Sequence, residues 1–235
     1  AMKKIRKIVG LLCIMLFACV VNTQNVGAAQ SDYVYDAATN SYTLQVKSGA
    51  NITDALTSAL DAAVGTEGNP AQIVIPSGSY SINLVKVTKS YVTISAEGAT
   101  IKFAGSTSSG QFVLKATDAS TTGVKISGGT WDGNSKASVI FQFGGDSVTT
   151  NNLTIENCTV KNADQNVKVN KGNNITFSKV TFANANYGIS VSNTKNLTMT
   201  GCSATGNTFG YGLRTLSGTN TLENCTATAN STDGL

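Results

Sequence analysis

The sequence contains no histidine, two prolines, one tryptophan and, beyond residue 29, a single arginine, Arg214. The absence of histidine excludes the Ser–His and Cys–His pairs that activate many nucleophilic hydrolases, and it removes the commonest zinc ligand. Charged residues make up only 13% of the chain. Few prolines and many Gly, Ser, Thr and Asn residues are typical of a secreted all-β protein with many tight turns.

The first 29 residues have the pattern of a secretory signal peptide. Four basic residues between positions 3 and 7 precede an apolar run over 8–21, which is short for a bilayer span, and small residues end the segment. We expect cleavage after Ala28 or Ala29, and a protein that is secreted from a bacterium or lies at its surface. Two alternatives stay open: a retained membrane anchor, and a lipid anchor at Cys19, which ends a stretch similar to a lipoprotein box.

Charge is balanced outside this leader. The formal net charge of +4 equals the four basic residues near the start, so 13 of the 17 basic residues remain against 13 acidic ones. A neutral mature chain gives no electrostatic reason to expect nucleic acid or an anionic membrane as partner. We expect no membrane span in the mature chain, and its length suits one domain, which we expect to be monomeric.

A short phrase recurs four times after residue 150. It begins at Asn152, Asn174, Asn196 and, more loosely, Asn220, and its matching positions Cys158, Val180, Cys202 and Cys225 lie 22, 22 and 23 residues apart. Such a period indicates a solenoid, in which each repeat is one coil that cannot bury its apolar face alone. Each phrase alternates apolar and β-branched residues with polar ones, which favours strands over helices. The sequence therefore predicts an all-β, right-handed parallel β-helix with about 22 residues per coil.

The stacking of coils predicts columns of like side chains. One column is expected to hold Ile155, Phe177, Met199 and Leu222. Two others are expected in the third strand of each coil, with Val167 over Ile189, Leu213 and Leu235, and Val169 over Val191 and Thr215.

The rest of the chain divides into three parts. Residues 30–50 are expected to form a lead-in strand segment. Residues 51–64 read as an amphipathic helix, with Asn51 or Thr53 able to cap its start, that covers the first coil. The β-helix then continues to residue 235, where no polar terminal cap is visible, so we expect further C-terminal coils beyond this sequence.

Three stretches resemble the opening of a known superfamily. They are Ile75-Pro-Ser-Gly-Ser-Tyr-Ser-Ile, Val92-Thr-Ile-Ser-Ala-Glu-Gly-Ala-Thr-Ile and Val124-Lys-Ile-Ser-Gly-Gly-Thr-Trp-Asp-Gly-Asn. Together they are similar to the pectin-lyase-like right-handed β-helix proteins, which include polygalacturonases, pectate lyases and phage tailspike depolymerases. The resemblance covers most of residues 50–235 and rests on structural turns. It implies a polysaccharide as partner, uronic acids among its candidate units, and either a lyase or a glycoside hydrolase as the activity.

The cysteines of the repeat are expected to be core residues. Cys158, Cys202 and Cys225 occupy one inward position, and Cys202 and Cys225 are neighbours in the stack. Adjacent strands bring Cα atoms within the range that a disulfide accepts, but parallel side chains aim poorly for its torsion angle. We therefore expect three reduced thiols, with a Cys202–Cys225 bridge as the alternative. No cysteine spacing indicates a metal site.

Hydrolysis of the polygalacturonase type needs clustered carboxylates. The resembling family carries an Asn-Thr-Asp stretch, then an Asp-Asp pair one coil later, then a Gly-His-Gly stretch. Here Asn162-Ala-Asp164 matches only in part, and Asn186-Tyr187 stands where the acid pair belongs. Asn230-Ser-Thr-Asp233 matches better, so Asp233 is a catalytic candidate, although a turn former is the simpler interpretation.

β-Elimination needs a base and a group that holds the uronate carboxylate. Arg214 is our candidate for either role, projecting outward in register with Ser190 and Lys168, on the face where relatives bind substrate. We expect Lys168, Ser190, Asp164, Tyr187 and Tyr211 to contact the sugar chain. The resemblance alone implies calcium, and no cofactor is evident from the residues.

The sequence thus favours a polysaccharide-binding protein that also processes its ligand. Two other classes stay open: a non-catalytic surface adhesin, and a structural stalk. Ordinary solvated side chains on an exposed strand would explain the same residues without any site.

Overall fold

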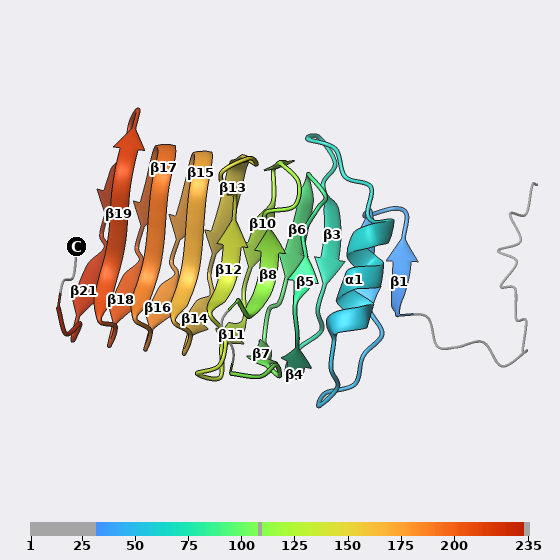
Figure 1. Ribbon diagram of the computed structural model, residues 1–235. Helices are drawn as coiled ribbons and strands as arrows, with labels where there is room; N and C mark the ends of the chain where they lie inside the picture. The colour runs from blue at the N-terminus through green and yellow to red at the C-terminus, as the bar shows by residue number, and fades with distance from the viewer. Residues whose placement is uncertain (1–31, 108–109, 233–235) are drawn as a thin grey trace, which may run out of the picture.

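The computed structural model describes residues 32–107 and 110–232. The predicted signal peptide, the cysteine of the alternative lipid anchor, Asp233 and Leu235 lie outside the described residues. Strands dominate and stack side by side from the N-terminal end to the C-terminal end (Figure 1). Among the described residues there is one helix, α1 (Thr53–Ala62), and it is not long or apolar enough to cross a membrane.

Each coil contributes up to three strands to two sheets of fourteen and seven strands, which are parallel except where β1 joins β2. The first strands of the coils are β3 (Ala71–Val74), β6 (Val92–Ser95), β10 (Lys125–Ser127), β13 (Thr150–Glu156), the second halves of β15 (Gln165–Ser178) and β17 (Tyr187–Thr200), and β20 (Thr221–Glu223). The second strands form the smaller sheet: β4 (Gly78–Ile82), β7 (Ala99–Phe103), β11 (Thr130–Asp132), β14 (Thr159–Lys161), β16 (Thr181–Ala183), β18 (Ser203–Thr205) and β21 (Thr226–Thr228).

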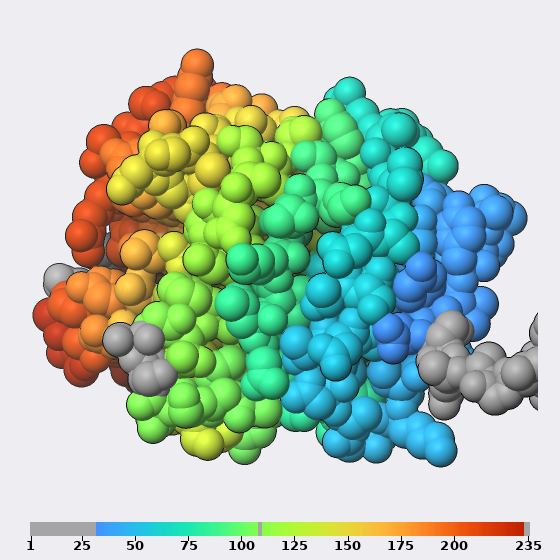
Figure 2. Space-filling view, turned by 45° about the vertical axis from the view of Figure 1, so that its right-hand side comes forward, coloured from blue at the N-terminus to red at the C-terminus, as the bar shows by residue number. Residues whose placement is uncertain are grey.

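The third strands carry most of the predicted site residues. They are β5 (Val85–Lys86), β8 (Phe112–Ala116), β12 (Val139–Phe143), the first halves of β15 and β17, and β19 (Phe209–Ser217). Outside this scheme, β1 (Tyr33–Asp36) pairs antiparallel with β2 (Ser41–Leu44), β2 pairs with β3, and the short β9 (Thr121–Thr122) pairs with β13. The colour bands of Figure 2 follow this order from one end of the molecule to the other.

The register confirms the first predicted column. Ile155, Phe177 and Met199 are directly paired and fully buried, and Leu222 continues the same column but is 39% exposed on the last strand. Paired positions in these coils are 22 residues apart, and 23 at the last step. Coils before residue 150 vary in length: partners are 21 residues apart from β3 to β6, 32 from β6 to β10 and 29 from β10 to β13. Since each fully buried apolar side chain contributes about 1.5–3 kcal/mol, such columns hold the stack together.

The predicted columns of the third strand are wrong after Ile189. Val167 and Ile189 are followed by Tyr211, not Leu213, and Val169 and Val191 are followed by Leu213. The register keeps its 22-residue step here, and the extra residue of this coil enters later in the chain. Choosing the aliphatic Leu213 as the inward residue therefore displaced the predicted register by two positions.

Left-handed residues recur at the bends of the coils. The bend between first and second strands is made by Asn157, Lys179, Gly201 and Asn224, with φ of 52°, 54°, 62° and 53°. Glycine and asparagine adopt this region most readily, whereas lysine enters it at a cost. The bend is therefore defined by a backbone conformation that each coil repeats, even where the residue type changes.

The helix is shorter than the predicted 51–64. Its alanine- and leucine-rich sequence favours a helix, and Ala55, Leu56, Ala59 and Leu60 are buried. The N-cap residue is Ile52, which makes no side-chain capping bond, so neither Asn51 nor Thr53 holds the predicted cap position. The side chain of Asn51 accepts hydrogen bonds from the backbone N–H and the hydroxyl of Thr53, at 2.9 and 2.6 Å, which satisfies one donor of the first turn.

The three thiols lie at one position of the coil, as predicted, with Val180 between Cys158 and Cys202, and all are free. Cys158 and Cys202 are buried, whereas Cys225 is half-buried. Burial raises the pKa of the Cys158 thiol to about 12 and that of Cys202 to about 11. Both groups therefore stay protonated at neutral pH and act as small apolar side chains.

Candidate functional site

The outward side chains of the third strands form rows along the stack. One row runs through Lys115, Gln142, Lys168, Ser190 and Gly212. The side chains of this row become shorter from Lys168 to Ser190 to Gly212, which leaves a depression in the surface. Neighbouring strands lie about 4.8 Å apart, so the row presents one side chain per coil at that interval.

The depression is an open groove of about 420 Å³, here called the strand groove. It is lined by Gln165, Lys168, Asn170, Tyr187, Ser190, Ser192, Asn193 and Arg214. Four residues predicted from the sequence, Lys168, Ser190, Tyr187 and Arg214, thus meet in one groove. The groove has two cationic side chains and no carboxylate among its lining residues.

Arg214 lies in this groove, but not in the predicted row. It is paired with Ser192 and, one coil further, Asn170, whereas Lys168 and Ser190 share their row with Gly212. The error has the same cause as the displaced column, since Tyr211 takes the inward position that Leu213 was expected to take. The exposed guanidinium of Arg214 lies over the Tyr187 ring, with 6.0 Å between its central carbon and the ring centroid.

Tyr211 is not a surface residue, contrary to prediction. Its side chain is only 4% exposed, its ring packs edge-on against Phe182, and its hydroxyl donates to the backbone carbonyl of Thr226 at 2.8 Å. Burial raises the pKa of this phenol well above its usual value. Tyr211 is therefore a core residue that links its strand to the next coil, and it cannot contact a ligand in the strand groove.

The aromatic side chain that accompanies Tyr187 is Phe209, which was not among the predicted site residues. The two rings stack with centroids 4.8 Å apart and an interplanar angle of 16°. They are paired in register, and their 22-residue separation, the period of the repeat, was the sequence signal that could have identified Phe209. The stacking means that each ring gives one of its faces to the other.

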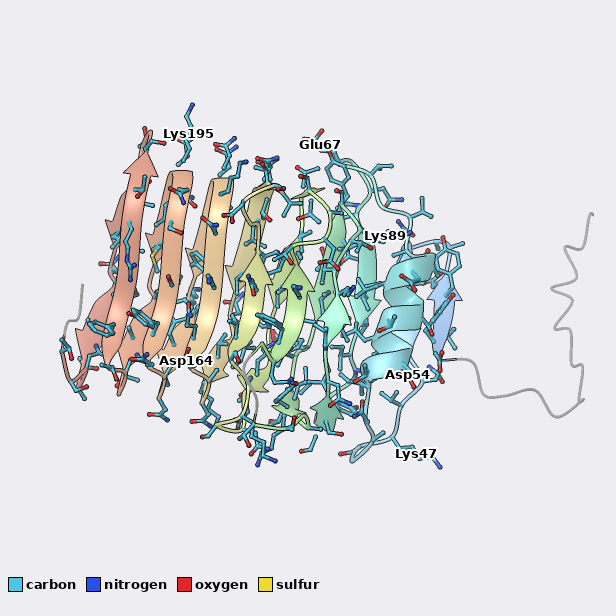
Figure 3. The ribbon with its side chains drawn as sticks, in the orientation of Figure 1. Lys47, Asp54, Glu67, Lys89, Asp164 and Lys195 are labelled. Atoms are coloured by element: carbon cyan, nitrogen blue, oxygen red, sulfur yellow. The ribbon has the colours of Figure 1, made fainter. Side chains whose placement is uncertain are left out.

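Asp164 lies in a second groove, of about 580 Å³, here called the turn groove. It is lined by Thr107, Ser135, Lys136, Ala137, Ser138, Asn162, Ala163, Asp164, Asn184 and Asn186. Asn186 donates its side-chain N–H to Asp164 at 3.2 Å. Figure 3 shows Asp164 at the turn that precedes β15, at the opposite end of the strands from Lys195. The structure thus separates Asp164 from the other predicted contact residues.

A polar network lies at the far end of the strand groove. The side-chain carbonyl of Asn170 accepts from the hydroxyl of Ser192 at 3.2 Å and from the amide of Asn193 at 2.8 Å, and its amide donates to Asp146 at 3.4 Å. These bonds hold the wall opposite Tyr187 in a defined conformation, so the groove is pre-formed on that side.

The lining residues restrict the chemistry. Hydrolysis of a glycosidic bond uses two carboxyl groups on either side of it, and the strand groove supplies none. Within residues 32–107 and 110–232, no group of three His, Cys, Asp or Glu side chains could hold a metal ion. The calcium implied by the family resemblance therefore finds no fitting ligand set here, and we derive no step through it. Two cations beside hydroxyl and amide groups are suited to an anionic ligand.

Comparisons with known proteins agree with this fold. Residues 145–235 match the family model described as a right-handed β-helix region. A provisionally named glycosyl hydrolase from Parabacteroides merdae is 18% identical, with a TM-score of 0.61 over 80% of this chain and 98% of its own. An open-reading-frame product of Geobacillus virus E2 is 13% identical, with a TM-score of 0.60 over 75% of this chain but only 39% of its own. No protein of curated function matches the sequence. These findings agree with the predicted right-handed β-helix, and at these identities the two structures establish the fold alone.

Proposed function

We propose, from the premise that residues 145–235 form a right-handed β-helix region, that this protein binds an acidic polysaccharide along the strand groove and processes it outside the cell. The observation that carries the proposal is the groove itself, in which Lys168 and Arg214 meet with no lining carboxylate. The Parabacteroides merdae structure supports a carbohydrate as ligand by its name. Extracellular location rests on the signal-peptide pattern of residues 1–29.

Arg214 is better suited to clamp a carboxylate than to act as a base. A guanidinium presents N–H donors in a planar fork and no acceptor, and that of Arg214 is exposed to a ligand. Its fork of N–H donors can bind both oxygens of a uronate carboxylate, and Lys168 adds a second positive charge. Two cations on that carboxylate would stabilise the negative charge that develops when the neighbouring carbon gives its proton to a base from solvent and the bond to the glycosidic oxygen breaks, the oxygen leaving with the next sugar. This arrangement favours β-elimination over hydrolysis as the processing route, because the groove lining supplies no carboxylate for hydrolysis.

The architecture supports a role as a linear platform. We propose a coil of about 22 residues as the repeating unit and α1 as the cap of the N-terminal end. Helix α1 contacts β1, β2, β3 and β5 and adds four buried residues to the core. A capped stack of this kind would present successive binding positions along one face, each about 4.8 Å from the next.

The proposal is tested with Arg214→Ala, Arg214→Lys and the control Lys195→Ala. Lys195 is an exposed cation of a neighbouring coil that does not line either groove. We expect Arg214→Ala to weaken binding to polygalacturonate about tenfold, Arg214→Lys to weaken it less, and Lys195→Ala to leave it unchanged. Binding should also weaken as salt is added, because these charges are exposed.

Ultraviolet absorbance of an unsaturated product separates an enzyme from an adhesin. Product formed by the wild type and lost in Arg214→Ala supports elimination at the strand groove. Binding without product supports a non-catalytic polysaccharide-binding protein. Unchanged binding in Arg214→Ala would show that the strand groove is not the acidic-polysaccharide site.

A further inference from the structure

The turn groove differs in chemistry from the strand groove. Its charged lining residues are one cation, Lys136, and one anion, Asp164, and its other polar groups are the amides of Asn162, Asn184 and Asn186 and the hydroxyls of Ser135, Ser138 and Thr107. The formal charge of its lining is therefore zero, whereas that of the strand groove is +2. A ligand in the turn groove has no charge to satisfy but many hydroxyl-sized donors and acceptors.

The conformation of the turn fixes these amides. Asn162 and Asn184 stand at equivalent positions of successive coils, both with left-handed φ, 61° and 53°. Asn162 donates to Asp132 at 2.9 Å, and Asn186 donates to Asp164. The bond from Asn186 uses one oxygen of Asp164 and leaves the other oxygen, the Asn186 carbonyl and the exposed Asn184 amide for a ligand. An acceptor beside a donor is the arrangement that a sugar hydroxyl requires, since a hydroxyl both donates and accepts.

The two grooves adjoin each other at consecutive residues. Asp164 lines the turn groove and Gln165 the strand groove, and Asn186 and Tyr187 repeat this division one coil later. Neighbouring residues of a strand are about 3.3 Å apart, so a ligand could occupy both grooves at once. A polymer with an acidic unit in the strand groove would then place an adjoining unit in the turn groove.

We propose that the turn groove is a binding site for a neutral sugar unit, and that the ligand is a heteropolysaccharide in which neutral sugars branch from, or alternate with, the acidic units. This inference rests on the proposed function for the strand groove. It predicts a preference for such a heteropolymer over an unbranched polyuronate. The preference comes from hydrogen bonds that Asn184, Asn186 and Asp164 make to sugar hydroxyls.

The test compares two probes, unbranched polygalacturonate and a rhamnogalacturonan with neutral galactan side chains, by affinity electrophoresis and calorimetry. The variant Asn184→Ala/Asn186→Ala removes the two amides, and Asn83→Ala serves as control because Asn83 is exposed and lines neither groove. We expect wild type to bind the branched polymer more tightly. The double variant should lose about 5- to 30-fold of that affinity and keep its affinity for polygalacturonate. Circular dichroism and the unfolding midpoint of each variant establish that it is folded.

The outcomes separate the two proposals. If the double variant binds both polymers as wild type does, the neutral-sugar site is refuted while the strand groove stands. If it loses affinity for both polymers equally, the turn groove has no separate preference and the inference is also wrong. If folded wild type binds neither polymer, the proposed function fails, and the inference fails with it. Arg214→Ala, in contrast, should weaken both complexes.

Discussion

Tyr211 and Tyr187 provide a matched test of the register of the third strand. Both are tyrosines of neighbouring coils, but Tyr211 points into the core and Tyr187 lines the strand groove. We predict that Tyr211→Ala lowers the free energy of unfolding by about 3–5 kcal/mol, because it removes a buried aromatic ring and leaves a cavity beside Phe182. Tyr211→Phe should cost only about 1 kcal/mol, since it loses one hydrogen bond, to the exposed Thr226.

Tyr187→Ala should behave in the opposite way. Its ring is half-buried and stacks on Phe209, so its loss should cost about 1 kcal/mol of stability but weaken polysaccharide binding. Urea unfolding, followed by circular dichroism, measures the free energy of unfolding of each variant. A loss of 3–5 kcal/mol shifts the midpoint by more than about 1 M at ordinary values of the urea dependence. The reasoning is refuted if Tyr211→Ala unfolds at the wild-type midpoint and loses binding, because Tyr211 would then be a ligand contact.

The remaining predictions concern thiols and bends. Under native conditions at pH 8, iodoacetamide should modify Cys225 first and barely react with Cys158 and Cys202, because the raised pKa values of these two thiols leave little thiolate. In denaturant all three thiols should react. If only one thiol reacts in denaturant, Cys202 and Cys225 form a disulfide. Because folding raises these two pKa values, their contribution to stability is complete below pH 9 and is lost as pH rises toward 11–12, so the unfolding midpoint should fall over that range. Lys179→Asn should raise the free energy of unfolding by about 0.5–1 kcal/mol, because asparagine tolerates the left-handed bend better than lysine does. The melting temperature should rise by about 2 °C. The control Lys161→Asn changes a residue that is not left-handed, and it should not raise the melting temperature.

The repeat was readable from the sequence wherever an apolar residue marks the same position in every coil. The register of Ile155, Phe177 and Met199, and that of the thiols, follows from the phrase that begins at each asparagine, because that phrase fixes the first and second strands. The third strand has no such phrase. Its inward position accepts Val167, Ile189 and Tyr211 alike, so hydrophobicity alone could not choose between Tyr211 and Leu213.

The candidate site was predicted in part for the same reason. Lys168 and Ser190, on one outward row of β15 and β17, were assigned to the correct face because strand alternation determines it. Tyr187 lines the same groove although it stands three residues before Ser190, because the two buried residues between them, Gly188 and Ile189, interrupt the alternation. Asp164 was assigned to that face as well, but the turn before β15 carries it into a different groove. Which side of a turn a residue lines depends on backbone dihedral angles, and the left-handed residues that set them could be recognised only where asparagine or glycine stands.

Because the bends repeat one left-handed backbone conformation, this protein can change its length by whole coils. Since Asn157, Lys179, Gly201 and Asn224 adopt one conformation despite their different side chains, a duplicated or deleted coil would meet its new neighbours in the same register. A shorter insertion keeps the columns where it falls between strands, as the extra residue of the last coil does between the pairs Lys195–Ser217 and Met199–Leu222. Lengthening by whole coils would extend both grooves in steps of one strand spacing, so ligand length could be altered by recombination without redesign of the core.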